Sequence, residues 1–252
     1  MTTPVILPLT TWGSATAPLR ALLVHGLGSN GALMWRTGTM LSELGWRADA
    51  VDLRGHGTAP RALDYTIAAY GTDLQHTRND DGPWDLVVAH SLGGAAATWA
   101  AANDATWTRR LILIDPAIRL AGRDHRIILA SQQRSFADGS VEASMAEHPN
   151  WHQQDHELKA LSVAQSSHWA IEQTLEQNEE TWDVRAEAAR LGVPTHIIGA
   201  DPSVYSIFTG DLAAEVLANP VITMTVVPGA GHSPHRDKPT AYVEQLAEAI
   251  GQ

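Results

Sequence analysis

A serine stands between two segments of contrasting pattern. Residues Trp84–Val88 are mostly apolar, residues 89–94 read Ala-His-Ser-Leu-Gly-Gly, and the alanine-rich stretch Ala95–Ala102 follows. A serine in a tight turn between a strand and a helix, flanked by small residues, is typical of a nucleophile elbow, which holds the hydroxyl clear of the sheet. The same residues also fit a loop that caps a helix. Ser91 is therefore a candidate nucleophile.

A histidine late in the sequence is the candidate base. A serine hydroxyl needs a base within hydrogen-bond reach, and the base needs a carboxylate that orients it. Residues 228–235 read Pro-Gly-Ala-Gly-His-Ser-Pro-His, directly after a predicted strand. A histidine on such a glycine-rich loop can reach the sheet edge at which Ser91 lies, so His232 is the predicted base. His235 is the spare candidate and is expected at the rim or the surface.

The composition is that of a globular enzyme, and it excludes several kinds of chemistry. The chain has 252 residues, 44% hydrophobic and 18% charged, which fits one large α/β domain or one domain with an insertion. It has no cysteine, so disulfides, thiolate metal sites and a cysteine nucleophile are excluded. The net charge of −11 argues against nucleic acid and anionic membranes as partners. Residues 1–5 do not resemble a signal peptide, and no stretch approaches about 20 apolar residues, so we expect a cytoplasmic protein.

Short apolar segments alternate with amphipathic ones along most of the chain. The apolar segments predict strands at Val5–Leu9, Ala21–His25, Arg47–Asp52, Asp85–Ala89, Arg110–Ile114, Thr195–Ile198 and Thr223–Val227. The amphipathic segments predict helices at Met34–Leu44, Ile67–Arg78, Gly93–Asn103, Asp211–Ala218 and Thr240–Ala249. Strands that are apolar along their length indicate a sheet covered on both faces. The alternation predicts an α/β fold with a mainly parallel central sheet and helices on both faces.

One long segment, residues 118–189, interrupts this alternation. It has no convincing strand, and it predicts helices at Asp124–Phe136, Asp155–Gln165 and Ser167–Asn178. Because it falls between two predicted strands, we expect a helical cap over the C-terminal edge of the sheet, where ligands bind in open α/β sheets. The predicted organisation is a core domain of residues 1–117 and 190–252 with this cap inserted. The cap is rich in tryptophan and histidine, and its candidates for a pocket wall are Trp151, His168, Trp169 and Trp182.

Two backbone amides are expected to hold the oxyanion that forms when a serine attacks a carbonyl. One is the amide of Leu92, which follows the serine at the start of a predicted helix, where the helix dipole favours negative charge. The other is assigned to Leu27 in the loop His25-Gly26-Leu27-Gly28, because glycines let the backbone approach a substrate closely. Glycine-rich loops also cradle phosphates, but this spacing matches neither a dinucleotide-binding loop nor a P-loop.

Taken together, these segments resemble the α/β-hydrolase superfamily over nearly the whole chain. The resemblance rests on residues 25–28, on residues 52–57 (Asp-Leu-Arg-Gly-His-Gly), on the Ser91 turn and on Gly231-His232, which occur in the order typical of the family. It implies an α/β-hydrolase fold with a helical cap. In this family the Asp-Leu-Arg-Gly-His-Gly stretch is mainly a structural turn, so no catalytic role is assigned to Asp52, Arg54 or His56.

The resemblance leaves two candidates for the carboxylate that orients the histidine. The family most often places it three residues beyond a glycine that follows the strand predicted here at Thr195–Ile198. In this chain Asp201 lies two residues beyond Gly199, and a proline takes the usual place. A minority of members, including pancreatic-type lipases and fungal zearalenone lactonases, place it after the strand that follows the nucleophile. Asp115 ends that strand here, so we favour Asp115 and keep Asp201 as the alternative.

The expected chemistry is hydrolysis of a carboxylic ester or a lactone through an acyl-enzyme, by a Ser-His-Asp triad without metal or organic cofactor. The substrate is then a small molecule. Serine at position 91 disfavours haloalkane dehalogenases and epoxide hydrolases, which need aspartate there. Carbon–carbon bond hydrolases, cofactor-free haloperoxidases and hydroxynitrile lyases share the serine triad and stay as alternatives. A receptor that binds a small ligand without turnover is the alternative of a different class.

Overall fold

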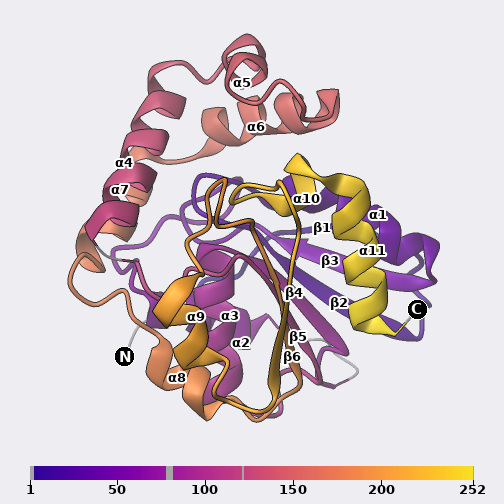
Figure 1. Ribbon diagram of the computed structural model, residues 1–252. Coiled ribbons are helices and arrows are strands. Elements are labelled where there is room, and N and C mark those ends of the chain that lie inside the picture. Colours follow the sequence, from indigo (N-terminus) through magenta and orange to yellow (C-terminus); the bar gives the residue numbers. More distant parts are fainter. Residues whose placement is uncertain (1–2, 78–81, 121, 252) are drawn as a thin grey trace.

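The molecule is organised around a central sheet of seven strands (Figure 1). The computed structural model describes residues 3–77, 82–120 and 122–251. In spatial order the strands are β1 (Leu9–Trp12), β3 (Trp46–Val51), β2 (Leu19–Val24), β4 (Leu86–His90), β5 (Leu111–Ile114), β6 (Thr195–Gly199) and β7 (Ile222–Val226). The β1 strand is antiparallel to β3, and the other neighbouring strands are parallel. The predicted α/β class with a mainly parallel sheet is confirmed.

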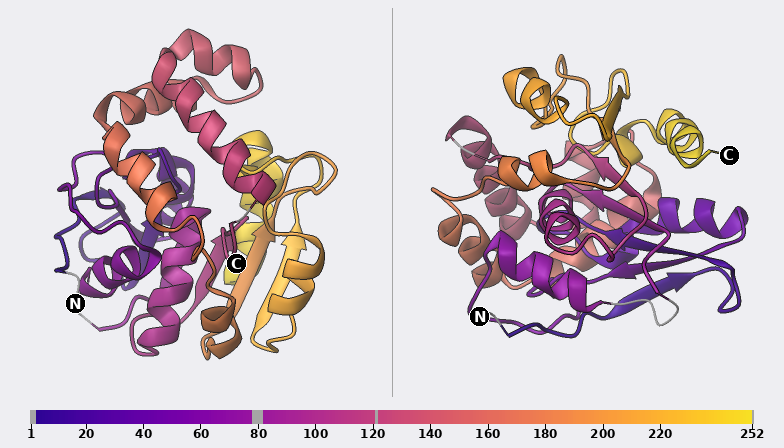
Figure 2. Two further views of the ribbon diagram at one scale, coloured as in Figure 1. Left: turned by 90° about the vertical axis from the view of Figure 1, so that its left-hand side faces the viewer. Right: turned by 90° about the horizontal axis from the view of Figure 1, so that it is seen from below.

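Strand residues alternate between two apolar cores, one on each face of the sheet. Leu86 and Val88 of β4 belong to one core, whereas Val87 and Ala89 belong to the other. The first core is covered by α1 (Trp35–Glu43) and α11 (Pro239–Ile250), and the second by α2 (Ile67–His76), α3 (Leu92–Asn103), α8 (Arg185–Arg190) and α9 (Gly210–Val216) (Figure 2). Each fully buried Val or Leu side chain contributes about 1.5–3 kcal/mol. Burial on both faces explains why the inner strands are apolar at nearly every position.

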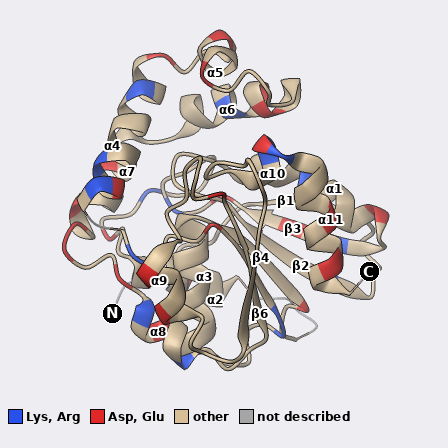
Figure 3. Ribbon diagram, viewed as in Figure 1, with Lys and Arg blue, Asp and Glu red and all other residues tan. Residues whose placement is uncertain are grey.

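Charged side chains lie mainly on the helices and loops around the sheet (Figure 3). The strands β4 to β7 contain no Asp, Glu, Lys or Arg. This is expected for β4 to β6, which lie inside the sheet, whereas β7 is an edge strand and is partly exposed. Of the helices built from the described residues, none is both long enough and apolar enough to cross a bilayer.

The longer predicted helices lie close to the observed ones, while the shortest helices were not predicted. The unpredicted elements are the 3-10 helix η1 (Gly31–Met34) and the helices α5 (Val141–Glu147), α8 and α10 (Pro234–Asp237). A helix of one or two turns is too short to show a 3.6-residue periodicity in the sequence. Arg78, the predicted end of the helix at α2, lies outside the described residues.

The first strand is the one strand prediction that was wrong. The segment Val5–Leu9 was predicted, but β1 runs from Leu9 to Trp12 and is exposed along most of its length. Prolines at positions 4 and 8 lack the N–H that a ladder needs, and the Val5 amide donates to the Asp73 side chain (2.8 Å). Because β1 is an edge strand, the polar sequence Leu-Thr-Thr-Trp can occupy it without an apolar run.

Four helices between β5 and α8 lie above the C-terminal ends of the strands (Figures 1 and 2). They are α4 (Gly122–Ala137), α5, α6 (Gln153–Gln165) and α7 (His168–Gln177). One polar link to the sheet layer is Asp155 of α6, which accepts hydrogen bonds from Trp35 Nε1 (2.8 Å) and Arg36 Nη2 (2.9 Å). The division into a core of residues 1–117 and 190–252 and a cap of residues 118–189 remains a prediction.

Candidate active site

Ser91 occupies a strained turn between β4 and α3. Its backbone φ of 53° and ψ of −117° lie outside the regions that L-residues prefer, and such strain costs about 1–3 kcal/mol. The turn is tightly enclosed. A Cβ at Gly93 would lie 2.5 Å from the His25 oxygen, and one at Gly94 would lie 2.7 Å from Pro116 Cβ. Small residues after the serine are therefore required by packing, as the sequence pattern predicted.

A continuous row of hydrogen bonds joins three of the predicted site residues. Ser91 Oγ lies 2.9 Å from His232 Nε2, and His232 Nδ1 lies 2.6 Å from Asp115 Oδ2. The carboxylate can only accept, so Nδ1 carries the proton toward Asp115 and Nε2 is free to accept the hydroxyl proton of Ser91. Residues separated by 141 positions in the sequence thus meet at one edge of the sheet. This is the geometry that removal of a serine proton by an imidazole requires.

Asp115 is held in place from several sides. Its side chain is fully buried, and its φ of 35° is the second positive value among the described non-glycine residues. Its carboxylate accepts hydrogen bonds from Ser206 Oγ (2.6 Å), the Ile207 amide (3.2 Å) and the Ala200 amide (3.4 Å). Together with His232, these donors compensate the cost of burying a charge. The carboxylate is therefore fixed in the orientation that it presents to the imidazole.

Asp201, the alternative acid, does not contact His232. Its Oδ1 accepts from the amide and the hydroxyl of Ser203, and its Oδ2 accepts from the Gly229 amide (2.8 Å). These hydrogen bonds hold the pKa of the Asp201 carboxyl below its usual value, and the bond from the Gly229 amide has the largest effect. The Asp201 amide also donates to Ala230 O (2.8 Å). Asp201 thus ties the loop after β6 to the loop that carries His232.

The two amides assigned to the oxyanion hole belong to the loop after β2 and the start of α3. Neither the amide of Leu27 nor that of Leu92 donates to a protein acceptor among the described residues. Leu92 is the first residue of α3, where helix amides have no partner within the helix. The loop approaches the serine closely, since a Cβ at Gly26 would lie 3.1 Å from Ser91 Cβ. Both amides therefore remain candidates for the oxyanion hole.

Two further histidines, His90 and His235, pack beside His232. The ring of His90 lies 4.9 Å from the ring of His232 and 4.8 Å from that of His235, between centroids. His90 Nε2 donates to the backbone oxygen of His232 (2.8 Å), which helps to fix the loop that carries His232. Burial holds the pKa of both His90 and His235 well below 6.5. The expectation that His235 lies at the rim or the surface was wrong, because it is buried against Tyr242.

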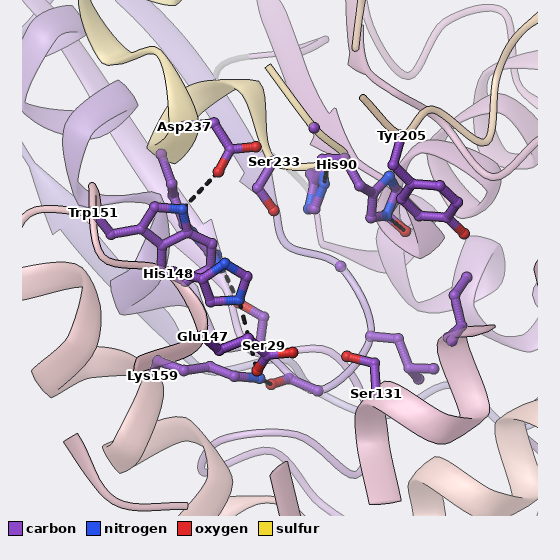
Figure 4. A pocket seen from close by; sticks show the side chains of 18 of the residues that line it. Ser29, His90, Ser131, Glu147, His148, Trp151, Lys159, Tyr205, Ser233 and Asp237 are labelled. Carbon is purple, nitrogen blue, oxygen red and sulfur yellow. Dashed lines mark hydrogen bonds and ion pairs between the residues drawn. The ribbon is translucent and has the colours of Figure 1, made fainter. Parts of the chain in front are cut away.

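A pocket of about 500 Å³ opens at Ser91 between the sheet edge and the helices above it (Figure 4). Trp151 and Trp182 lie in its wall, as expected. His168 and Trp169 do not line it, contrary to expectation. His168 stacks on Phe136 with centroids 3.6 Å apart, and Trp169 is 43% exposed with its ring against Tyr65. Both belong to the first turn of α7, and no residue of that turn lines the pocket.

Several polar residues of the pocket wall were not identified from the sequence. They include Ser29, His90, Arg134, Glu147, Lys159, Tyr205, Arg236, Asp237 and Lys238. Arg236 and Asp237 follow His232 closely and could have been found by position, whereas no local pattern distinguishes Lys159. Among the described residues no cluster of three or more His, Asp or Glu side chains is placed to hold a metal ion.

Comparison with known proteins places these features in a family. The alpha/beta hydrolase family matches residues 21–245. The lipase LipV of Mycobacterium tuberculosis is 38% identical over 109 residues, covering 42% of this chain and 41% of LipV. A pimeloyl-[acyl-carrier protein] methyl ester esterase of Neisseria meningitidis is 33% identical over 132 residues, covering 51% of this chain and 49% of the esterase. The chain thus matches less than half the length of these two relatives.

Solved structures agree with the fold described above. The E-2-(acetamidomethylene)succinate hydrolase superposes with a TM-score of 0.81 at 23% identity, covering 98% of this chain and 96% of that protein. An esterase from Exiguobacterium antarcticum superposes with a TM-score of 0.77 at 19% identity, covering each chain in full. At these identities the likeness establishes the architecture and leaves the substrate open.

Proposed function

The chain belongs to the alpha/beta hydrolase family, and we propose that within it the protein is a serine hydrolase that cleaves a carboxylic ester or a lactone. The family and the lipase and esterase relatives support hydrolysis as the general reaction. The observation that supports the finer assignment is the hydrogen-bonded row of Ser91, His232 and Asp115 at the mouth of a pocket. A serine with an oriented imidazole and two free amides beside it fits acyl transfer.

In the proposed first step, His232 Nε2 removes the proton from Ser91 Oγ as the oxygen attacks the substrate carbonyl. The negative charge that develops on the carbonyl oxygen is stabilised by the amides of Leu27 and Leu92. The imidazolium then gives its proton to the leaving alcohol, and the acyl group stays on Ser91. Asp115 acts through His232, because it keeps the ring in the required tautomer and stabilises its charged form.

In the second step a water molecule replaces the alcohol. His232 removes a proton from this water, the hydroxide attacks the acyl carbonyl, and the same two amides hold the oxyanion. His232 returns the proton to Ser91 Oγ, and the carboxylic acid leaves. For a lactone the alcohol and the acid are parts of one molecule, so the product is a hydroxy acid.

A fluorophosphonate probe tests this proposal directly. The probe should label Ser91, and Ser91→Ala should lose both the labelling and the hydrolysis of short 4-nitrophenyl esters by several orders of magnitude. Ser42→Ala on α1, outside the pocket, is the matched control and should keep both. A protein that binds small esters but is neither labelled nor active would be a receptor. A substrate panel with esters, lactones and carbon–carbon cleavage substrates then separates the chemistries that share the triad.

A further inference from the structure

Four cationic side chains line the pocket that contains Ser91: Arg134 and Lys238, which reach solvent, and Lys159 and Arg236, which are at least partly buried. Lys159 comes from α6 (Figure 4). Its Nζ donates to the backbone oxygen of Gly28 (3.3 Å). Arg236 comes from α10, four residues after His232, and is 6% exposed. Within the parts of the chain that the structure describes, neither Lys159 nor Arg236 forms an ion pair with a carboxylate. These two inner cations of the pocket therefore lack a carboxylate partner within the described protein.

The carboxylates whose charge acts on Arg236 are bound to other groups. Asp155 forms an ion pair with Arg36 at 2.9 Å, in which the Asp155 side chain is buried and the Arg36 side chain is partly exposed. Asp237 accepts from the indole of Trp151 at 2.6 Å. Both acids lower the cost of burying the guanidinium, but neither satisfies its hydrogen-bond donors.

Glu147 is the acidic residue whose charge acts on Lys159. It pairs instead with Arg134 at 3.2 Å, and its side chain is 41% exposed. A second contact of Glu147, at 3.8 Å, is with His148. Because solvent screens this exposed pair, it offsets little of the positive charge inside the pocket.

The donors of Arg236 are left largely unused. Its Nε is buried without a hydrogen-bond partner, and its Nη2 reaches Ser29 Oγ at 3.4 Å. The guanidinium lies 5.1 Å from the ring centroid of Trp151. Burial, together with repulsion from Arg236, lowers the pKa of Lys159 to about 8. An unpartnered buried cation is costly, and a bound anion that accepts from these donors removes that cost.

We propose that Arg236, Lys159 and Ser29 form a subsite for a carboxylate, so that the substrate is an ester carrying a second, ionised carboxyl group. Ser29 lies two residues after Leu27, and Arg236 lies on the helix that follows His232, so the subsite adjoins the reacting carbonyl. The proposal deepens the proposed function and rests on it. The carboxylate belongs either to the acid part or to the alcohol part of the ester, and the substrates below distinguish the two.

Matched pairs of esters that differ in one charge test the subsite. Methyl hydrogen glutarate and its neutral half-amide ester place a carboxylate or an isosteric amide on the acid side. Acetoxyacetate and acetoxyacetamide do the same on the alcohol side. For one of the pairs, kcat/KM should be about tenfold or more higher for the carboxylate, the size expected of one charge-assisted hydrogen bond. Equal or lower kcat/KM for the carboxylate in both pairs overturns the proposal.

Substitutions of Lys159 and Arg236 test whether these two cations cause the preference for the carboxylate ester over its amide. Lys159→Met should lower kcat/KM for the preferred carboxylate about tenfold and leave the neutral amide within about twofold. Arg236→Met should act in the same direction, and Arg236→Lys should restore part of the preference. Arg190→Met, an exposed arginine paired with Glu187 outside the pocket, is the control and should change neither. An equal loss for the charged and the neutral ester in Lys159→Met contradicts the subsite.

Binding measurements separate this proposal from the proposed function. Calorimetry with Ser91→Ala should show tighter binding of the preferred carboxylate than of its amide, even though the variant cannot turn it over. If the wild-type protein hydrolyses 4-nitrophenyl acetate but shows no preference in either pair, the hydrolase assignment stands and the subsite fails. If Ser91→Ala binds the carboxylate selectively and the wild-type protein cleaves no ester, the subsite stands and the hydrolase assignment fails. Stronger inhibition by inorganic phosphate than by glutarate overturns the choice of a carboxylate.

Discussion

The sheet edge and the helices above it meet at one pocket, but they are built in different ways. Ser91 and Asp115 directly follow β4 and β5, two central strands whose register is fixed by parallel pairing. By contrast, α4 of the upper layer has no buried residue along its length. The first region is positioned by main-chain hydrogen bonds between strands and by two apolar cores. The second has no strand pairing and is held by side-chain contacts, including those of α7 and α4 with one of the cores.

This difference separates the proposed chemistry from the proposed specificity. In the part of the chain that the structure describes, the two non-glycine residues with positive φ, Ser91 and Asp115, lie at the sheet edge, where the surrounding core can maintain strained backbone. The α4–α7 layer supplies Trp151 and Lys159 to the pocket wall, and substitutions there need not disturb the sheet. Changes at the sheet edge should therefore alter the rate, and changes in the upper layer should alter which ester is accepted.

The largest expected effect is at the sheet edge. Asp115→Asn should lower kcat by about 10³- to 10⁴-fold with little change in KM, because an asparagine no longer fixes the tautomer of His232. Asp201→Asn is the matched control. It removes a carboxylate that supports the loop of His232, but it leaves the Asp115 carboxylate that contacts the His232 ring in place. Its kcat should stay within about threefold, because asparagine can still accept from the Gly229 amide.

Steady-state kinetics with a 4-nitrophenyl ester measures both variants, and circular dichroism verifies that each is folded. Labelling by a fluorophosphonate probe should slow in Asp115→Asn and not in Asp201→Asn, a difference that a general loss of stability does not produce. A larger loss of kcat in Asp201→Asn than in Asp115→Asn would make Asp201 the acid that acts on His232. It would contradict the function proposed for the hydrogen-bonded row of Ser91, His232 and Asp115.

Ion pairs provide the second comparison between the two regions. Arg54 and Asp73 are both fully buried and 2.6 Å apart, below the sheet edge. Arg54→Met leaves the Asp73 charge unpaired and should lower the free energy of unfolding by about 3–5 kcal/mol. Arg134→Met in the upper layer breaks an exposed pair with Glu147 and should cost less than about 1 kcal/mol. Urea unfolding measures both, and similar losses would contradict the difference in construction.

The parts of the site that depend on strand order were predictable from the sequence. Ser91 has a local signature, and His232 follows the last strand on a glycine-rich loop. Asp115 was favoured because it ends the strand beside the nucleophile strand, and the observed contact lies there. The preference could not be decided further, since Asp201 also follows a strand and only the distance to His232 separates the two.

The pocket wall could be predicted only in part, because the sequence does not specify which side of a helix or loop above the sheet faces inward. Trp151 and Trp182 line the pocket while His168 and Trp169 do not, although all four are of similar types. Lys159 was missed for the same reason. Its burial depends on how α6 packs over the loop at Gly28, a contact between segments 131 positions apart.

Two fully buried histidines, His25 and His56, are expected to make the stability of the protein depend on pH. Burial lowers the pKa of His25 to about 4 and that of His56 to about 3. The unfolded chain takes up these protons near pH 6.5 and the native state does not, so stability falls as the pH drops below 6.5. For His25 the loss reaches about 3 kcal/mol near pH 4 and then levels off.

Urea unfolding at pH 7.5, 6.5, 5.5 and 5.0 measures this loss. His25 Nε2 accepts from the Leu53 amide and Nδ1 donates to Gly26 O, so both ring atoms are committed in the neutral form. His25→Gln should reduce the slope of stability against pH between 6.5 and 5.0, whatever its effect at neutral pH. A slope unchanged by the substitution would exclude His25 as a source of the acid sensitivity.

The smallest expected effect lies in the upper layer, at Trp151. Its indole donates to Asp237 at 2.6 Å and so links the loop after α5 to the helix that follows His232. Trp151→Phe keeps an aromatic ring against Arg236 but removes the hydrogen bond, a change of about 1 kcal/mol. KM for 4-nitrophenyl butyrate should rise about three- to tenfold with kcat within twofold, because the pocket wall changes and the triad does not.

Trp169→Phe is the control for this prediction, since Trp169 is of the same type and lies outside the pocket. It should leave both KM and kcat unchanged. If Trp151→Phe lowers kcat as strongly as it raises KM, then the link to Asp237 also positions His232, because Asp237 and His232 lie only five residues apart. Substitutions in the upper layer would then alter the rate as well as the choice of ester wherever they act through α10, the helix that follows His232.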